Sequence, residues 1–119
     1  MHAVEQYARA HIVTDTADSL DDERRTVPVA LRYDPEDDPR QVHITLPGPH
    51  EWTFERELLE QGLRGPVTSG DVRVWPCGRV QAVMEFHSPK GVALVQVDSK
   101  ALLRFLRRTY TVAGTPVAH

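Results

Sequence analysis

Apolar residues recur at every second position in several stretches of this chain, and short clusters of turn-forming residues separate those stretches. The pattern is clearest from Val27 to Tyr33 and from Gln41 to Leu46. It returns in three closely spaced segments, Asp71–Trp75, Arg79–Phe86 and Val92–Val97. Side chains alternate between the two faces of a strand, and short turns join antiparallel neighbours. The spacing therefore predicts a largely antiparallel sheet.

A further strand is predicted near the N-terminus, over residues 3–14, where apolar and β-favouring side chains fall on both faces. Apolar groups on both sides of a strand predict that both of its faces are partly covered. A helix remains the alternative for this segment, because a helical stripe is also matched by Ala3, Gln6, Tyr7 and Ala10. Residues 15–26 follow as a polar run without apolar periodicity, which predicts a loop.

The first predicted helix lies between these groups of strands. Trp52 is expected to be an aromatic packing anchor just before it, with Thr53 as the N-cap and Phe54 opening the apolar face. Acidic residues in the first turn match the helix macrodipole. Gly62 suits the end of this helix, and Pro66 forbids its continuation.

The second predicted helix follows the last strand and is capped by Asp98 or Ser99. Gly114 and Pro116 end it. Three basic residues are placed in its last turns, where the dipole favours cations: Arg104, Arg107 and Arg108. Together with Lys100 they could instead follow the phosphates of a nucleic acid. A solvated, dipole-matched helix end is the favoured interpretation.

Together these elements predict one α+β domain over residues 1–119. A chain of this length falls within the usual range for a single domain and buries roughly two thirds of its unfolded surface. The expected order is three strands, a helix, three strands and a helix. This gives an antiparallel β domain of about six to seven strands with two helices. Residues 111–119 are expected to form a short C-terminal tail.

Motifs for reaction chemistry are missing from the sequence. The single cysteine, Cys77, cannot form an internal disulfide or a zinc site by itself, and the six histidines lack the i,i+4 spacing of a metal motif. Signatures of a serine nucleophile, a kinase or a glycine-rich phosphate loop are absent as well. We therefore expect a protein that is not an enzyme, with no catalytic residue, no metal site and no cofactor.

Charge and hydropathy narrow the classes of partner. The formal net charge of -3 argues against nucleic-acid binding, because phosphate contacts need a basic surface. No window approaches the roughly 18 apolar residues that a membrane span requires, and no signal peptide is evident. We expect no nucleic acid as partner and no direct insertion into a membrane.

Arg73, Trp75 and Pro76 are the candidate protein-contact residues. In the strand predicted over residues 71–75, Trp75 shares a face with charged side chains and is expected to be exposed beside Arg73 and Pro76. Tryptophan and arginine are enriched in protein interfaces. Trp52 and Trp75 are also candidates for stacking bases of a nucleic acid, although packing is favoured for Trp52.

Four sequence blocks, in order, resemble a known family: Val29–Pro35, Asp38-Pro39, Trp52–Leu59 followed by Gly62-Leu63, and Gly70–Pro76. Their order and spacing are similar to those of the SsgA-like proteins of actinomycetes, which act in sporulation-specific cell division. The resemblance runs from about Val27 to about Thr109, which is most of the chain.

The resemblance implies a non-enzymatic adaptor that helps to place or build sporulation septa, through recruitment of the division GTPase FtsZ or control of septal peptidoglycan remodelling. It implies a homotrimer, a cytoplasmic location at the septum, and partners such as FtsZ or another SsgA-like protein. It also implies a fold similar to the Whirly proteins, which motivates the alternative function of single-stranded nucleic-acid binding. The family usually carries an acidic, apolar tail after the last helix, and we expect functions of that tail not to transfer to a chain that ends at His119.

Overall fold

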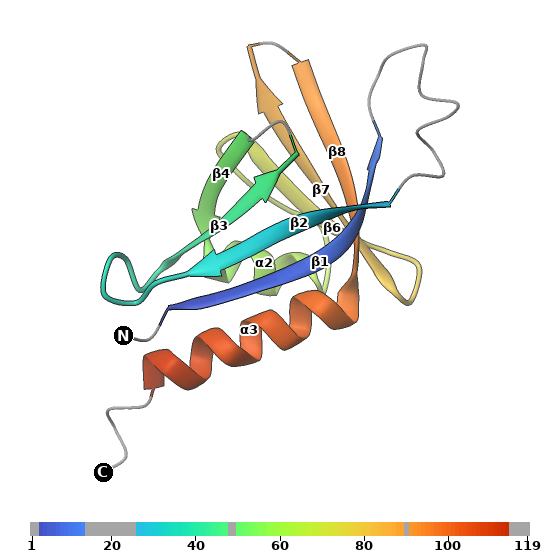
Figure 1. Ribbon diagram of the computed structural model, residues 1–119. Coiled ribbons are helices and arrows are strands. Elements are labelled where there is room, and N and C mark those ends of the chain that lie inside the picture. The colour runs from blue at the N-terminus through green and yellow to red at the C-terminus, as the bar shows by residue number, and fades with distance from the viewer. Residues whose placement is uncertain (1–2, 14–25, 48–49, 90, 115–119) are drawn as a thin grey trace.

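Figure 1 shows a computed structural model of the protein, which describes residues 3–13, 26–47, 50–89 and 91–114. Within these residues, one antiparallel sheet of eight strands curves around the core, and two helices, α2 (Arg56–Gly62) and α3 (Ser99–Gly114), lie against it. The strands are β1 (Val4–Val13), β2 (Thr26–Tyr33), β3 (Gln41–Leu46), β4 (His50–Glu55), β5 (Val67–Ser69), β6 (Val72–Cys77), β7 (Gln81–Ser88) and β8 (Gly91–Asp98). The predicted α+β class and antiparallel arrangement are confirmed.

The strand order in the sheet is β4-β3-β2-β1-β8-β7-β6-β5. Strands β1 to β4 form one meander and β5 to β8 form a second. The two meanders join where β1 pairs antiparallel with β8, with Ala10 opposite Val97. The pairing of β1 with β2 is longer and begins with Val4 opposite Tyr33. Strand β1 therefore holds the two halves of the sheet together.

Strand β1 occupies the predicted N-terminal segment, so the helical alternative is wrong. Its buried side carries Val4, Gln6, Ala8 and Ala10. Tyr7 lies on the opposite side and is 68% exposed. The expectation that both faces of this strand are covered is also wrong, because the sheet buries one face and turns the other to solvent, as antiparallel sheets commonly do.

Strand β4 replaces a loop and a helix start predicted over the same residues. Trp52 lies opposite Ile44 of β3, and Thr53 lies opposite His43 with 2.9 Å between its Oγ1 and the histidine Nδ1. Thr53 therefore does not cap a helix. Helix α2 begins only at Arg56, after a residue whose side chain makes no capping hydrogen bond. The predicted start at Thr53 is wrong because pairing with β3 satisfies the backbone groups of this segment instead.

Strand β5 is the second strand that the sequence pattern did not predict, and it brings the total from about six or seven to eight in the described part of the chain. Its three residues pair with β6, from Val67 opposite Val74 to Ser69 opposite Val72. Gly70, in the tight turn between the two strands, has a φ of 58°, a left-handed value that glycine adopts without steric cost. So short a strand shows too little alternation to be recognised from sequence.

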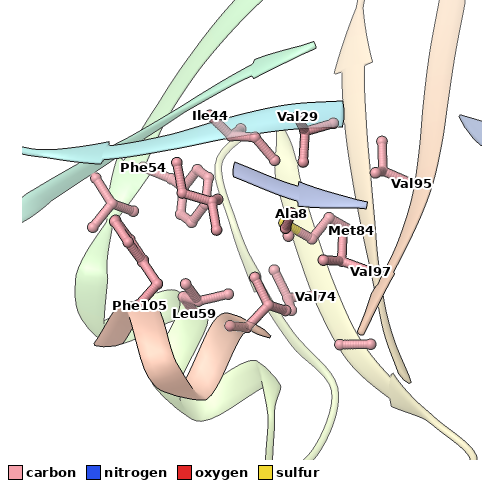
Figure 2. Close-up of a cluster of buried hydrophobic side chains, with 14 of the residues drawn as sticks. Ala8, Val29, Ile44, Phe54, Leu59, Val74, Met84, Val95, Val97 and Phe105 are labelled. Atoms are coloured by element: carbon pink, nitrogen blue, oxygen red, sulfur yellow. The ribbon is translucent and has the colours of Figure 1, made fainter. Parts of the chain in front are cut away.

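The core fills the concave face of the sheet beneath the helices. Figure 2 shows side chains from both meanders converging there with Leu59 of α2 and Phe105 of α3. Phe86 and Phe105 are among the largest fully buried side chains. The strand predicted from Arg79 begins two residues later, so Val80 lies in the turn before β7 and is 61% exposed.

Helix α3 starts where the sequence predicts, because the backbone N–H of Lys100 donates to Asp98 Oδ1 at 3.1 Å, which makes Asp98 the cap. The helix continues to Gly114, so residues 111–114, predicted as part of the tail, are helical. Its last turn carries no basic residue. The dipole explanation for the arginines is therefore wrong, since they lie in the middle turns of the helix.

Parts of two predicted segments lie outside the described residues. These are residues 15–25 of the predicted polar loop and residues 115–119 of the predicted tail; Thr26 belongs to β2. Neither helix in the described ranges is both long and apolar enough to cross a membrane.

Candidate protein-contact surfaces

Strand β6 carries the three predicted contact residues on both of its faces. On the outer face, the guanidinium carbon of Arg73 lies 5.0 Å from the centre of the Trp75 ring, which is a cation–π contact. Arg73 is exposed and Trp75 is half-buried. Pro76 follows directly in the strand and so belongs to the opposite face. The structure brings Arg73 and Trp75 together and separates Pro76 from them.

Two neighbours on β7 extend the outer face around this pair. Val83 lies opposite Trp75, and Glu85 lies opposite Arg73. Val83 is 5% exposed although it belongs to the outer face of the sheet. Cross-strand neighbours on one face lie close together, so the Trp75 ring is placed to cover Val83. We call these four residues the outer patch; an indole ring with an arginine over its face is a composition typical of protein interfaces.

Trp52 has the packing role that the sequence predicts. Its ring lies on the inner side of β4 and stacks on Phe86 of β7, with 5.0 Å between ring centroids and 27° between planes. This contact ties the first meander to the second across the core. The Trp52 ring is therefore engaged inside the fold and is not an exposed platform for bases.

A groove that the sequence did not predict lies between α2, α3 and the turn that joins β6 to β7. Its volume is about 370 Å³, and we call it the helix groove. Its apolar lining comes from leucines: Leu63, Leu103 and Leu106. Its basic lining comes from arginines: Arg64, Arg79 and Arg107. Pro76, which points away from the outer patch, belongs to the lining of this groove.

One sequence signal of the helix groove is a stripe along α3. Leu103, Arg107 and Tyr110 follow one another at intervals of four and three residues, so they share one face of the helix. Leu103 is 43% exposed and Tyr110 is 41% exposed. The remaining walls come from segments far away in the chain, which only the folded arrangement brings together.

Arg56 fixes the Tyr110 side of the groove. Its guanidinium carbon lies 3.9 Å from the ring centre of Tyr110 and 5.3 Å from that of Tyr33. The hydroxyl of Tyr110 donates to Glu60 Oε1 at 2.9 Å, and the hydroxyl of Tyr33 donates to the Pro39 carbonyl at 2.9 Å. Partial burial raises the pKa of the Tyr110 hydroxyl, and its hydrogen bond to Glu60 adds to that rise. These contacts hold the phenol ring in one position.

The ionisable side chains of the described residues do not gather into a metal site, since no three His, Cys, Asp or Glu side chains come together there. The exposed His87 pairs with Glu85, with 2.9 Å between Nε2 and Oε1. Cys77 is a half-buried free thiol at the end of β6. The surface of this part of the chain carries the outer patch and the helix groove.

These features define a small α+β domain with one curved antiparallel sheet, an outer tryptophan–arginine patch and an arginine-rimmed groove between its helices. The family model described as "Streptomyces sporulation and cell division protein, SsgA" matches residues 27–116. The chain belongs to this family, which confirms the resemblance seen in the sequence blocks.

Curated relatives of the chain include sporulation-specific cell division proteins named SsgB. The SsgB of Salinispora tropica is 43% identical over 97 residues, which cover 74% of this chain and 67% of the relative. The SsgB of Streptomyces coelicolor is 44% identical over 90 residues, which cover 70% of this chain and 65% of the relative. The chain thus spans about two thirds or slightly less of the length of these relatives.

Solved structures share the fold. One comes from work on mutations in SsgB that correlate to longitudinal cell division during sporulation of Streptomyces coelicolor. It matches with a TM-score of 0.77 and 38% sequence identity, and the match covers 92% of this chain and 85% of that chain. The crystal structure of an SsgA-like sporulation-specific cell division protein from Thermobifida fusca matches with a TM-score of 0.71 and 28% identity, over 92% and 81% of the two chains.

Proposed function

We propose that the protein is a non-enzymatic adaptor in sporulation-specific cell division that helps to position or build septa. The identity of 43% and 44% to sporulation-specific cell division proteins carries this proposal. The outer patch and the helix groove support it, because both are suited to contacts with macromolecules. The adaptor acts by recruiting FtsZ or by controlling septal peptidoglycan remodelling, and FtsZ or another SsgA-like protein is its partner.

The same proposal includes a cytoplasmic protein that gathers at the septum as a homotrimer. The homotrimer is what the resemblance to the SsgA-like family implies. Light scattering on the purified protein tests the assembly, with an expected mass three times that of the 13.4 kDa chain. A monomeric mass across the accessible concentration range contradicts the trimer.

Fluorescence of a tagged copy in a sporulating filament tests the adaptor role. We expect bands at the septa for the wild type, and weaker bands for a variant that combines Arg73→Ala with Trp75→Ala. Thr68→Ala is the matched control, because Thr68 is exposed and lies opposite Arg73 on the same face. Diffuse fluorescence of the wild type throughout sporulation contradicts the proposal, and a pull-down with FtsZ then tests the partner directly.

A second candidate function is single-stranded nucleic-acid binding, which the implied similarity to the Whirly fold motivates. The observation that favours it is α3, whose sequence carries four cations and no acidic residue: Lys100, Arg104, Arg107 and Arg108. Titration with a labelled oligonucleotide at low and high salt tests this function, since phosphate contacts weaken steeply with salt. The net charge of -3 leads us to expect no binding near physiological salt.

A further inference from the structure

We infer that the helix groove is a docking site for an acidic peptide segment of a partner protein, in which aliphatic or aromatic side chains accompany the carboxylates. This inference deepens the proposed adaptor function and rests on it. The main evidence is that apolar side chains share the lining of one groove with guanidinium groups that form no ion pair with the described residues.

The charge of the groove sets the first requirement on its ligand. Arg64, Arg79 and Arg107 are exposed and form no ion pair with any described residue. Glu60 is the carboxylate in the lining, and it already accepts a hydrogen bond from Tyr110. Three positive charges thus face one negative charge, in a chain whose formal net charge is -3. Because arginine binds carboxylates through strong paired hydrogen bonds, this local excess favours an acidic ligand.

The fold itself does not account for most of the cations on α3. Arg108 has a structural role, since its Nη1 donates to Gln6 Oε1 at 3.3 Å. The side chains of Lys100, Arg104 and Arg107 form no hydrogen bond or ion pair with the described residues. The helix dipole does not explain them either, because the last turn of α3 holds no basic residue. Arg107, which lines the groove, is therefore free to bind a ligand.

The apolar lining sets the second requirement. Leu106 is 4% exposed and forms part of the floor, whereas Leu103 is 43% exposed and Leu63 is half-buried. A volume of about 370 Å³ lies at the lower end of the range for ligand sites and has room for a few side chains. A peptide that lays an apolar face on these leucines brings its flanking carboxylates to the arginines, as in other helix grooves that bind amphipathic segments.

The lining of the groove matches a nucleic acid less well than it matches such a peptide. Single-stranded nucleic acids bind where successive bases stack on free aromatic rings. Tyr110 is the aromatic residue in the lining, and the Arg56 guanidinium already lies 3.9 Å from its ring centre. The rest of the lining offers leucine side chains, which favour aliphatic and aromatic side chains over bases with polar edges. The composition of the groove therefore favours a peptide.

Nuclear magnetic resonance on the isotope-labelled full chain tests the assignment. The probe is a synthetic peptide that alternates Asp and Glu with Leu and Phe, and two matched peptides replace the acidic residues by their amides or the apolar residues by Ser. We expect the first peptide to shift backbone amides of α2, of the turn between β6 and β7, and of α3. Each matched peptide is expected to bind at least about tenfold more weakly, because each lacks one of the two interactions.

Substitutions in the groove provide the second arm of the test. Arg64→Gln combined with Arg107→Gln is expected to weaken binding of the probe at least about tenfold. Arg9→Gln combined with Arg40→Gln removes the same charge from exposed positions outside the groove and is expected to leave binding unchanged. Leu103→Ser tests the apolar lining separately. All five side chains are exposed, so unchanged melting temperatures are expected and exclude unfolding as the cause.

Several results would overturn the inference. Absence of binding at millimolar probe overturns it, and so does equal binding to both double variants. If an oligonucleotide, and not the peptide, shifts the resonances of the same amides, the groove is a nucleic-acid site. If these resonances shift when the protein alone is concentrated, the groove binds a second copy of the chain. Septal localisation is measured separately, so a wild type that localises but does not bind the probe refutes the groove assignment and leaves the adaptor role standing.

Discussion

Gly62 lies where the end of α2 touches β6, and the contact leaves no room for a side chain. A Cβ atom at this position would lie 2.3 Å from Val74 Cγ1 and 2.4 Å from Val74 Cβ. Val74 is fully buried, and rotation about its Cα–Cβ bond moves Cγ1 but leaves Cβ in place, so rotation of the valine side chain alone does not relieve the clash. We predict that Gly62→Ala forces α2 and β6 apart and destabilises the fold.

The size of this effect follows from two opposing contributions. The closest contact would be about 1 Å shorter than the 3.4 Å at which ordinary contacts begin, which puts the cost near the upper end of the range for overpacking, about 3 kcal/mol. Alanine favours a helix over glycine by up to about 1 kcal/mol. The free energy of unfolding should therefore fall by about 2 kcal/mol, which corresponds to a melting temperature lower by roughly 6 to 12 °C.

Urea denaturation followed by circular dichroism measures the change. Gly65→Ala is the matched control, because Gly65 follows the same helix, has no left-handed backbone angle, and leaves open space around an added Cβ. The control is expected to be neutral or stabilised by up to about 1 kcal/mol. If the two variants have the same stability, the argument that α2 packs on β6 too closely for a methyl group is refuted.

Three further changes test other parts of the structure. Arg56→Met should lower the free energy of unfolding by about 1–2 kcal/mol, because two tyrosine rings lose their cation–π partner. The control Arg104→Met, on the exposed surface of α3, should change the free energy of unfolding by less than about 0.5 kcal/mol. Urea denaturation of the two variants compares these values. Asp98→Ala should cost about 1 kcal/mol through loss of the α3 cap, and thermal melts should show a smaller loss for Thr53→Ala, because Thr53 lies on a strand. The pKa of Tyr110 is raised in the folded state, so its contribution to stability is full below the unfolded pKa of about 10 and is lost as pH rises through the folded pKa. Tyr110→Phe should therefore reduce the loss of unfolding free energy in the alkaline range. If the dependence of the unfolding free energy on alkaline pH is the same in this variant as in the wild type, the Tyr110 hydroxyl is not its source.

The strands with strict alternation are predictable from sequence, because a buried inner face and a polar outer face impose a period of two. Val27 to Tyr33 and Gln41 to Leu46 are of this kind. Strand β4 escapes prediction because Trp52 and Phe54 alternate over a short stretch, and the glutamates that follow Thr53 imitate the first turn of a helix. Pairing with β3 selects the strand over the predicted helix start, and the local sequence pattern does not reveal that pairing.

The candidate surfaces show the same limit. Arg73 and Trp75 could be placed on one face because they are two residues apart, whereas Pro76, one residue further on, falls on the other. The helix groove combines Leu63 after α2, Arg79 in a turn and residues of α3. These segments meet only through the packing of both helices on the sheet. The stripe on α3 can therefore be recognised from the sequence, whereas the helix groove beside it cannot.

Strand β1 protects the sheet from association with other chains. Its ten residues separate β2 from β8, and Gln6 also reaches α3 by donating from Nε2 to the Ala101 carbonyl at 2.8 Å. Removing this strand would leave β2 and β8 as two new edge strands, each with a row of unpaired backbone N–H and C=O groups that can pair with another chain. A truncated form is therefore expected to aggregate, which would show as turbidity and loss of the monodisperse species, even though every other strand still has a neighbour of its own.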